Sequence, residues 1–413
     1  TETTDPASLP YAVARVSWAG GSASEFCGGK AALPSEAARV AVCEAAERFQ
    51  VTFARPGETL VRAAYDELRD RAVDPRALFF DAVPGHGTTL RPYSDHAPAL
   101  WTTVDDPLGG PRRLVPAEEV WFDATEAEGC FVAQTTSGCA LGATREEAAA
   151  FGMLEAVERD AFLTAWYLRR PCAPIDPDSV ASEAFQLLRR RWEAAYSDYN
   201  FHLFDATGDA RVPVVIGVAV RRRGSGPRAF VSAAARLSAG RACHAALKDL
   251  AGFLPVLPEE KRRAYRASLE APEQVRGPAG HFETYALDEA FARLEFLDFA
   301  PAPRGAVTAA EIDARALVAP AERHQPREVV RRVAARLRAL GAALYLKDLT
   351  HPALASRGLH CVRAVTPGLY PMWFGPATRR FAVTERLRRL SREWTGREIH
   401  GEADCNLEVH PLA

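Results

Sequence analysis

Apolar residues recur along this chain in two spacings, one typical of helices and one typical of strands. Five stretches repeat apolar side chains on one helical face and are predicted as helices: residues 35–50, 144–168, 182–196, 238–253 and 326–341. Short apolar or alternating runs predict strands: residues 11–18, 112–123, 201–207, 213–220, 342–350 and 360–375, the last running into a Gly-Pro turn. We expect loops at residues 271–282, and across residues 84–115 around one short strand.

Two helix starts carry capping signals. Ser35 follows Pro34 and is a candidate N-cap, while Thr144 and Glu147 predict a capping box. Strands and helices interleave without a clean linker. We therefore expect an α/β fold: one large domain over residues 1–413, with mixed sheets and packed helices.

Composition narrows the class of protein. The chain has 413 residues, 48% hydrophobic and 25% charged, with a net charge of −2, so no broad basic field indicates nucleic acid or an anionic membrane as a partner. The N-terminus lacks the features of a signal peptide, and the apolar run at 212–220 is too short to span a bilayer. Eight cysteines form no Cys-x-x-Cys pair, which predicts free, buried thiols in a cytoplasmic protein.

One acidic pattern occurs twice, as Glu-x-x-Glu-Arg, on two predicted helices more than a hundred residues apart. The copies are Glu44, Glu47 and Arg48, and Glu155, Glu158 and Arg159. In a helix, residues at i, i+3 and i+4 share a face, so each copy presents two carboxylates beside a guanidinium. The ordinary interpretation is a solvated face with internal salt bridges.

The apolar context of both copies favours a different interpretation. Partly buried carboxylates need cationic partners, and four acids exceed two arginines. Magnesium prefers oxygen ligands and usually bridges to phosphate. We therefore predict that the two helices face one another across one cleft that holds a magnesium-bound nucleotide.

Other catalytic or phosphate-binding patterns are absent from the sequence. The segment "CGGKA" differs from a P-loop, since its first glycine is misplaced and Ala31 stands where Ser or Thr would meet magnesium. No Gly-x-Gly-x-x-Gly opens a helix after a strand, and no nucleophile elbow supports a Ser-His-Asp site.

Three segments, in this order, resemble the YcaO family, ATP-dependent enzymes that activate backbone amides of peptides. "GGKAALPSEAARVAVCEAAERF" is similar to the first ATP motif, and "TTSGCALGATREEAAAFGMLEAVERDAF" to the family's most recognisable segment. "LYLKDLTHPALASRGLHCVRAVTPGLYP" resembles a strand and turn of the azoline-forming members. The resemblance covers nearly the whole chain. It implies a large α/β domain without a P-loop, in which glutamates hold magnesium around ATP.

The resemblance assigns roles to particular residues. Magnesium or nucleotide ligands would be the four acids of the repeated pattern: Glu44, Glu47, Glu155 and Glu158. Lys30, Arg48 and Arg159 would orient the helices or meet phosphates. Asp249 would stand for the Glu of the third ATP motif.

The sequence also departs from the family pattern. Ala41 replaces a Ser, Ser137 replaces an Asn, and Gly252 lies near the expected Gln of the third motif. Azoline-forming members often end in Pro-x-Pro-x-Pro, whereas this chain ends "NLEVHPLA". These departures keep open a catalytically weak, YcaO-like scaffold subunit of a peptide-modification complex.

The resemblance implies ATP- and magnesium-dependent cyclodehydration of Cys, Ser or Thr in a precursor peptide, giving thiazoline or oxazoline. Thioamide and macroamidine formation remain alternatives. Candidates for the base are the terminal carboxylate of Ala413 and His410. We expect a separate leader-peptide-binding partner protein, since no N-terminal extension resembles a peptide clamp, and we keep a homodimer as an open alternative.

Overall fold

The computed structural model describes residues 9–17, 24–55, 57–79, 90–122, 131–132, 134–224, 226–251, 266, 270–300 and 305–412. Strands within these ranges are β1 Tyr11–Ser17, β2 Ser24–Lys30, β3 Val61–Ala63, β4 Ala99–Val104, β5 Arg113–Pro116, β6 Cys139–Gly142, β7 Ala173–Pro174, β8 Tyr199–Asp205, β9 Val214–Arg221, β10 Ala229–Ala235, β11 Tyr345–Asp348 and β12 His360–Val365. Helices are α1 Pro34–Thr52, α2 Tyr65–Leu68, α3 Arg145–Leu168, α4 Glu183–Ala195, α5 Ala239–Leu250, α7 Gly277–Thr284, α8 Ala309–Arg315, α9 Pro326–Ala339, α10 Pro352–Ala355 and α11 Glu385–Thr395.

The strands form four sheets around a central helix. Their orders are β1-β2, β3-β4-β5, β11-β12-β6 and β10-β9-β8-β7, and every ladder is antiparallel. Parallel pairing occurs at two isolated bridges, Ala72 with Leu114 and Ile175 with Val307, so the expected mixture of directions lies outside the named strands. The α/β fold class is confirmed.

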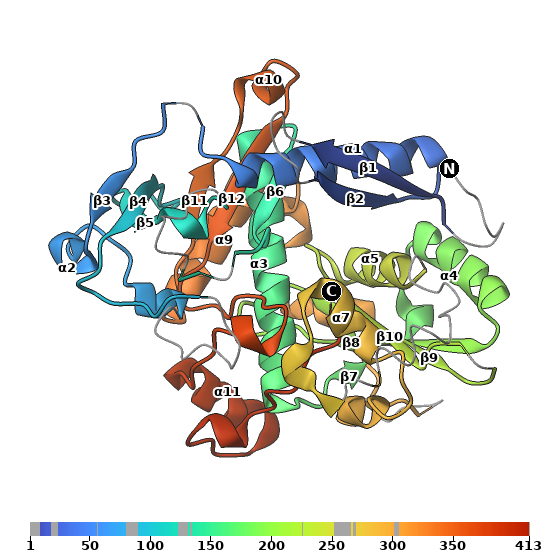
Figure 1. The fold of residues 1–413 in the computed structure, drawn as a ribbon. Helices are drawn as coiled ribbons and strands as arrows, with labels where there is room; N and C mark the ends of the chain where they lie inside the picture. The colour runs from blue at the N-terminus through green and yellow to red at the C-terminus, as the bar shows by residue number, and fades with distance from the viewer. Residues whose placement is uncertain are drawn as a thin grey trace.

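Helix α3 runs through the middle of the molecule (Figure 1). It packs against β6 and β12 near one end and against β10, α9 and α11 elsewhere. Its sequence explains this position, because nearly all of its residues after the first turn are buried and a helix that is apolar on all sides needs neighbours on all sides. Helix α1 instead lies on the β1-β2 hairpin, above α5 in Figure 1.

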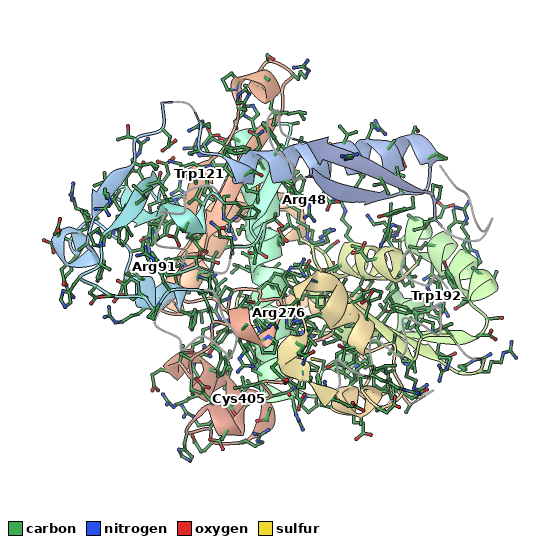
Figure 2. The ribbon with its side chains drawn as sticks, viewed as in Figure 1. Arg48, Arg91, Trp121, Trp192, Arg276 and Cys405 are labelled. Atoms are coloured by element: carbon green, nitrogen blue, oxygen red, sulfur yellow. The ribbon has the colours of Figure 1, made fainter. Side chains whose placement is uncertain are left out.

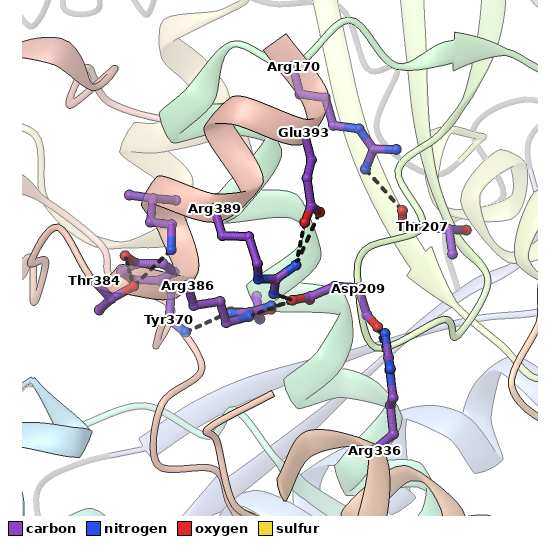
Figure 3. A network of polar contacts seen from close by, with 11 residues as sticks. Arg170, Thr207, Asp209, Arg336, Tyr370, Thr384, Arg386, Arg389 and Glu393 are labelled. Carbon is purple, nitrogen blue, oxygen red and sulfur yellow. Dashed lines mark hydrogen bonds and ion pairs between the residues drawn. The ribbon is translucent and has the colours of Figure 1, made fainter. Parts of the chain in front are cut away.

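A buried ionic network holds α3 at Asp160. Asp160 accepts two hydrogen bonds from Arg386 of α11, at 2.8 and 2.6 Å, and one from the Tyr370 amide at 2.9 Å. Arg386 also contacts Asp209, at 2.6 Å, and Arg389 joins Asp209 at 2.7 Å (Figure 3). Asp160 is only 2% exposed, so this network fixes α3 to its surroundings.

Most predicted elements are present, with four differences. Residues 271–282 are not a loop, because a 3-10 helix at Pro272–Gln274 and helix α7 together cover most of them. Residues 112–123 hold only β5 before a short 3-10 helix. Ser35 lies inside α1, whose N-cap is Leu33 and whose first residue is Pro34. At α3, the Thr144 hydroxyl accepts from the Glu147 amide as predicted, but the Glu147 carboxylate accepts from Ala143 instead of Thr144.

Two broader expectations can be compared with the structure. The described cysteines are all free; Cys43 is exposed and Cys405 is partly exposed, whereas the others are buried as predicted. None of the described helices combines the length and apolarity needed to cross a membrane.

Candidate functional site

The copy of the acidic pattern on α3 is held by backbone amides. Glu155 accepts a hydrogen bond from the Gly138 amide at 3.1 Å, and Glu158 accepts one from the Ala235 amide, at the end of β10, at 2.8 Å. Arg159 lies between the two acids, 3.5 Å from Glu155 and 3.9 Å from Glu158. Burial raises the pKa of Glu158 to about 7 against the opposing effects of Arg159 and the Ala235 amide.

The copy on α1 is more open to solvent. Arg48 donates to Glu44 through Nε at 3.2 Å and Nη2 at 2.9 Å, and both side chains are about one-third exposed. Arg48 lies beside the junction of α1 with α3 (Figure 2). The carboxylate of Glu47 is hydrogen-bonded by the backbone of Leu141 in β6, and the charges of Glu44 and Arg48 also act on it.

The two copies meet through Glu47 and Glu155. Burial raises the pKa of Glu47 to about 8, and the next largest cause is the negative charge of Glu155, with a further contribution from Glu44. Carboxylates interact in this way only when they are close neighbours. Glu47 of α1 and Glu155 of α3 therefore face one shared region. That the two helices enclose one nucleotide cleft stays a prediction.

Two glycines make this approach possible. A Cβ on Gly29 of β2 would lie 2.1 Å from the Ala37 carbonyl oxygen of α1, so only glycine lets the strand lie this close to the helix. Gly138 has φ +82, a conformation that favours glycine, and its amide donates to Glu155. The small-residue segments before each helix thus have structural roles.

Lys30 and Asp249 complete the rim of the site. The Lys30 ammonium, at the end of β2, lies 3.5 Å from the backbone oxygen of Asp249 in α5. Burial lowers the pKa of Lys30, opposed first by the charge of Asp249, and Glu44 also acts on it. Gly252, expected near the missing Gln, lies outside the described residues.

A pocket of about 230 Å³ opens beside these residues. Its polar side is formed by Glu158, Arg159, Ser232 and Asp249. Its apolar side is formed by Val231, Ala233, Phe282 and Leu412. Half polar and half apolar walls suit a ligand with a charged part and an uncharged part.

The acids are suited to magnesium held jointly with phosphate. Two of them, Glu47 and Glu158, have raised pKa values because they are withdrawn from water, which is the situation that a bound cation relieves. No three acidic, His or Cys side chains converge tightly enough among the described residues to enclose an ion by themselves. Magnesium usually binds one or two carboxylates and fills its other coordination positions with water and phosphate. Acids that do not enclose an ion by themselves are therefore suitable magnesium ligands.

His410 has a structural position, and the expectation that it could be a free base is corrected. Its Nε2 donates to the Trp373 carbonyl at 2.9 Å, and its Nδ1 lies 3.2 Å from Nδ1 of His281. His281 in turn donates from Nδ1 to the His410 carbonyl at 2.9 Å and accepts from the Gly375 amide at 2.7 Å. Both rings are buried, which lowers the pKa of both and keeps them neutral.

This pair of histidines fixes the C-terminal tail against the site. Further bonds reach the tail from Tyr285, whose hydroxyl donates to the Val409 carbonyl at 2.6 Å, and from Trp166, which donates to the Glu408 carbonyl at 3.1 Å. Leu412 therefore lines the pocket. Ala413 lies outside the described residues. The sequence analysis did not identify His281, because a lone histidine in an expected loop carries no pattern.

Comparison with known families gives a match over most of the chain. The family described as YcaO cyclodehydratase, ATP- and Mg²⁺-binding, matches residues 28–370. An uncharacterized protein of Methanothermobacter thermautotrophicus is 30% identical over 193 residues, which is 46% of this chain and 47% of that protein.

Solved structures share the fold. A heterocyclase in complex with substrate and cofactor has a TM-score of 0.72 at 22% identity, over 94% of this chain and 50% of that one. YcaO from Methanopyrus kandleri, bound with AMPPCP and Mg²⁺, has a TM-score of 0.59 at 19% identity, over 88% and 83%. The E. coli microcin synthetase McbBCD complex with pro-MccB17 bound gives 0.60 at 12%, over 98% and 96%. The chain thus spans about half the length of the archaeal relative and of the first heterocyclase.

Proposed function

Since the chain belongs to the YcaO family, we propose that it uses ATP and magnesium to activate a backbone amide of a precursor peptide. The reaction is cyclodehydration of Cys, Ser or Thr to a thiazoline or oxazoline. The observation that carries this proposal is the position of Glu47 on α1 and Glu155 on α3, where the negative charge of Glu155 helps to raise the pKa of Glu47.

The proposed reaction balances as follows. The thiol or hydroxyl of the peptide adds to the preceding carbonyl carbon, and the resulting oxygen takes the γ-phosphoryl group of ATP, releasing ADP. Loss of that group as phosphate, together with the amide proton, closes the C=N bond of the azoline. Each ring therefore costs the peptide one water and consumes one ATP.

The described residues supply charge and position for this reaction. Glu44, Glu47, Glu155 and Glu158 are proposed to hold magnesium, which would neutralise the phosphate charge when bound. Arg159 is placed between two of the acids and lines the pocket, where it can reach a phosphate group. Arg48 orients Glu44 through their ion pair.

Lys30 and Asp249 form the opposite rim of the site. We propose that Lys30 meets a phosphate group and that Asp249 contacts the nucleotide. For the base, the terminal carboxylate of Ala413 stays a proposal. Its support is that the residue before it, Leu412, lines the same pocket as Glu158 and Arg159.

Partner proteins also belong to this proposal. The McbBCD structure is a complex with pro-MccB17 bound. By analogy, we propose that this chain acts on a precursor peptide together with a leader-peptide-binding protein, in the cytoplasm, and that a homodimer can form. The molecular mass of the chain in solution, measured alone and with the partner protein, tests for the homodimer and for the complex.

The function is tested with Mg·ATP and a Cys-, Ser- or Thr-containing precursor peptide encoded beside the gene, with the partner protein present. We expect the peptide to lose one water for each phosphate released, and a Cys→Ala peptide to lose none at that position. An oxygen-to-sulfur exchange would indicate a thioamide. Failure of the chain to bind Mg·ATP under every condition would contradict the proposal and favour the scaffold interpretation.

A further inference from the structure

Helix α5 carries basic side chains near Asp249, the residue that stands for the Glu of the family's third ATP motif. His244 and Lys248 are four residues apart, so they share one face of α5. That face lies opposite the buried alanines and leucines of the helix. Arg236 lies in the turn that joins β10 to α5. Arg236 thus precedes the first turn of α5, whereas Lys248 lies in its last turn, near Lys30.

Among the described residues, none of these three side chains forms an ion pair with an acid within 4 Å. Arg236 donates a hydrogen bond to the Ala235 carbonyl at 2.7 Å. Nδ1 of His244 is buried and has no hydrogen-bond partner. A buried nitrogen without a hydrogen-bond partner costs free energy that a ligand could recover, and the cations Arg236 and Lys248 beside it are exposed or partly exposed to solvent.

The three residues lie next to the acidic side of the site. Arg236 directly follows Ala235, whose amide binds Glu158, and the charge of Arg236 acts on that carboxylate. At the other end, Lys248 acts on Lys30, which itself lies 3.5 Å from the Asp249 carbonyl. Between them, burial lowers the pKa of His244, and Lys248 and Arg236 lower it further. The basic residues thus form a wall that runs from Lys30 to Glu158.

We propose that Arg236, His244 and Lys248 bind the phosphate groups of the nucleotide and replace the missing residues of the third ATP motif. This inference rests on the proposed function and adds the residues that hold the phosphate chain. Magnesium and the glutamates of α1 and α3 would meet one side of that chain, and the basic wall would meet the other.

The chemistry of each residue fits a phosphate oxygen. Arg236 and Lys248 donate charge-assisted hydrogen bonds, which are shorter and stronger than neutral ones. His244 is held neutral in the empty site, and a neutral imidazole can present an N–H from Nδ1. A ligand with several negative charges would also relieve the repulsion among these cations.

The inference is tested by titrating the full chain with Mg·ATP, adenosine and inorganic phosphate. We expect Lys248→Met and Arg236→Met each to weaken Mg·ATP binding by about tenfold to a hundredfold. Adenosine binding should not change. His244→Ala should also weaken Mg·ATP, and His244→Asn should restore part of the loss because its amide reaches the position of Nδ1. The matched control is Arg331→Met, which removes an exposed charge from α9.

The outcomes separate this inference from the proposed function. If the wild-type chain binds Mg·ATP and all three variants bind it equally well, the basic wall has no role and this inference alone is overturned. Loss of inorganic phosphate binding with Mg·ATP binding intact would also overturn it, since the wall would then serve free phosphate. If the wild-type chain does not bind Mg·ATP, both proposals are overturned.

Discussion

The two copies of Glu-x-x-Glu-Arg differ in how the protein holds them. On α3, Glu155 and Glu158 each accept a hydrogen bond from a backbone amide. Asp160, the residue after the pattern, is held by hydrogen bonds from Arg386. On α1, Glu44 forms an ion pair with Arg48, four residues later on the same helix, and both side chains are about one-third exposed.

Burial of the two helices shows the same contrast. Eighteen residues of α3 are buried, but only five of α1, and α1 exposes apolar side chains that include Val42 and Phe49. Identical side chains at identical spacing therefore form a fixed half and a more adaptable half of one site. We infer that α3 sets the position of the metal and nucleotide, and that α1 adjusts to them.

The largest effect is expected from the anchor of α3. Asp160→Ala should lower the free energy of unfolding by about 3 kcal/mol or more, because it leaves Arg386 and the Tyr370 amide short of a buried partner. Urea unfolding measures this change. The control, Glu385→Ala, removes the 85%-exposed partner of Arg388 and should change stability by less than about 1 kcal/mol. Equal effects of the two variants would show that α3 is not anchored by this network.

The next effect concerns the acids of α3. Glu155→Gln and Glu158→Gln should reduce ATP consumption by more than about a hundredfold, since even outer partners of metal ligands change affinity by 10- to 100-fold. Each Gln keeps an oxygen for the backbone amide, so the fold should remain. A phosphate-release assay measures the loss of ATP consumption, and thermal unfolding checks that the fold remains. Unchanged phosphate release by both variants would contradict the assignment of these residues.

Much of this arrangement could be predicted from sequence. The repeated pattern predicted that acids of α1 and α3 lie near one another, because helical spacing fixes which side chains share a face, and Glu47 and Glu155 do so. The amides of Gly138 and Ala235 could not be predicted, since every residue has such a donor and only the tertiary fold places one against a carboxylate. Nor did the pattern reveal β10, because four of its seven residues are alanine and Val231 is its one β-branched residue.

Helix α7 was missed for a related reason. It has only eight residues and begins Gly277-Pro278, so its local sequence indicates a loop. Its helical form depends on tertiary contacts, among them the stacking of Phe282 on Phe230, with ring centroids 5.2 Å apart, and the hydrogen bonds of His281. Its side chains nevertheless line the pocket and hold the tail.

A smaller effect should appear in the pH dependence of Mg·ATP binding. Below about pH 8, Glu47 holds a proton in the empty site, and a cation must displace it. Affinity should therefore rise with pH, by up to about tenfold per unit for one released proton, and level off above pH 8. Glu158 adds a second released proton below about pH 7. In Glu47→Gln the rise between pH 7 and 8 should be absent. The same slope in both proteins would exclude Glu47 as the titrating group.

The smallest effect is expected from the ion pair on α1. Glu44 and Arg48 are partly exposed, and i, i+4 pairs in such settings contribute about 0.3–0.5 kcal/mol to stability. A double-mutant cycle with Glu44→Gln and Arg48→Met, measured by urea unfolding, should give a coupling of that size in the empty protein. With Mg·ATP bound, the coupling should change, because Glu44 would then contact the metal as well as Arg48. The anchor pair on α3, Asp160 and Arg386, gives the comparison, because it is buried and takes no part in the proposed metal or phosphate contacts. Its coupling, measured with Asp160→Asn and Arg386→Met, should be nearly the same with and without Mg·ATP. If the coupling of Glu44 with Arg48 also stays the same when Mg·ATP binds, α1 does not adjust to the ligand, and the distinction between a fixed and an adaptable half fails.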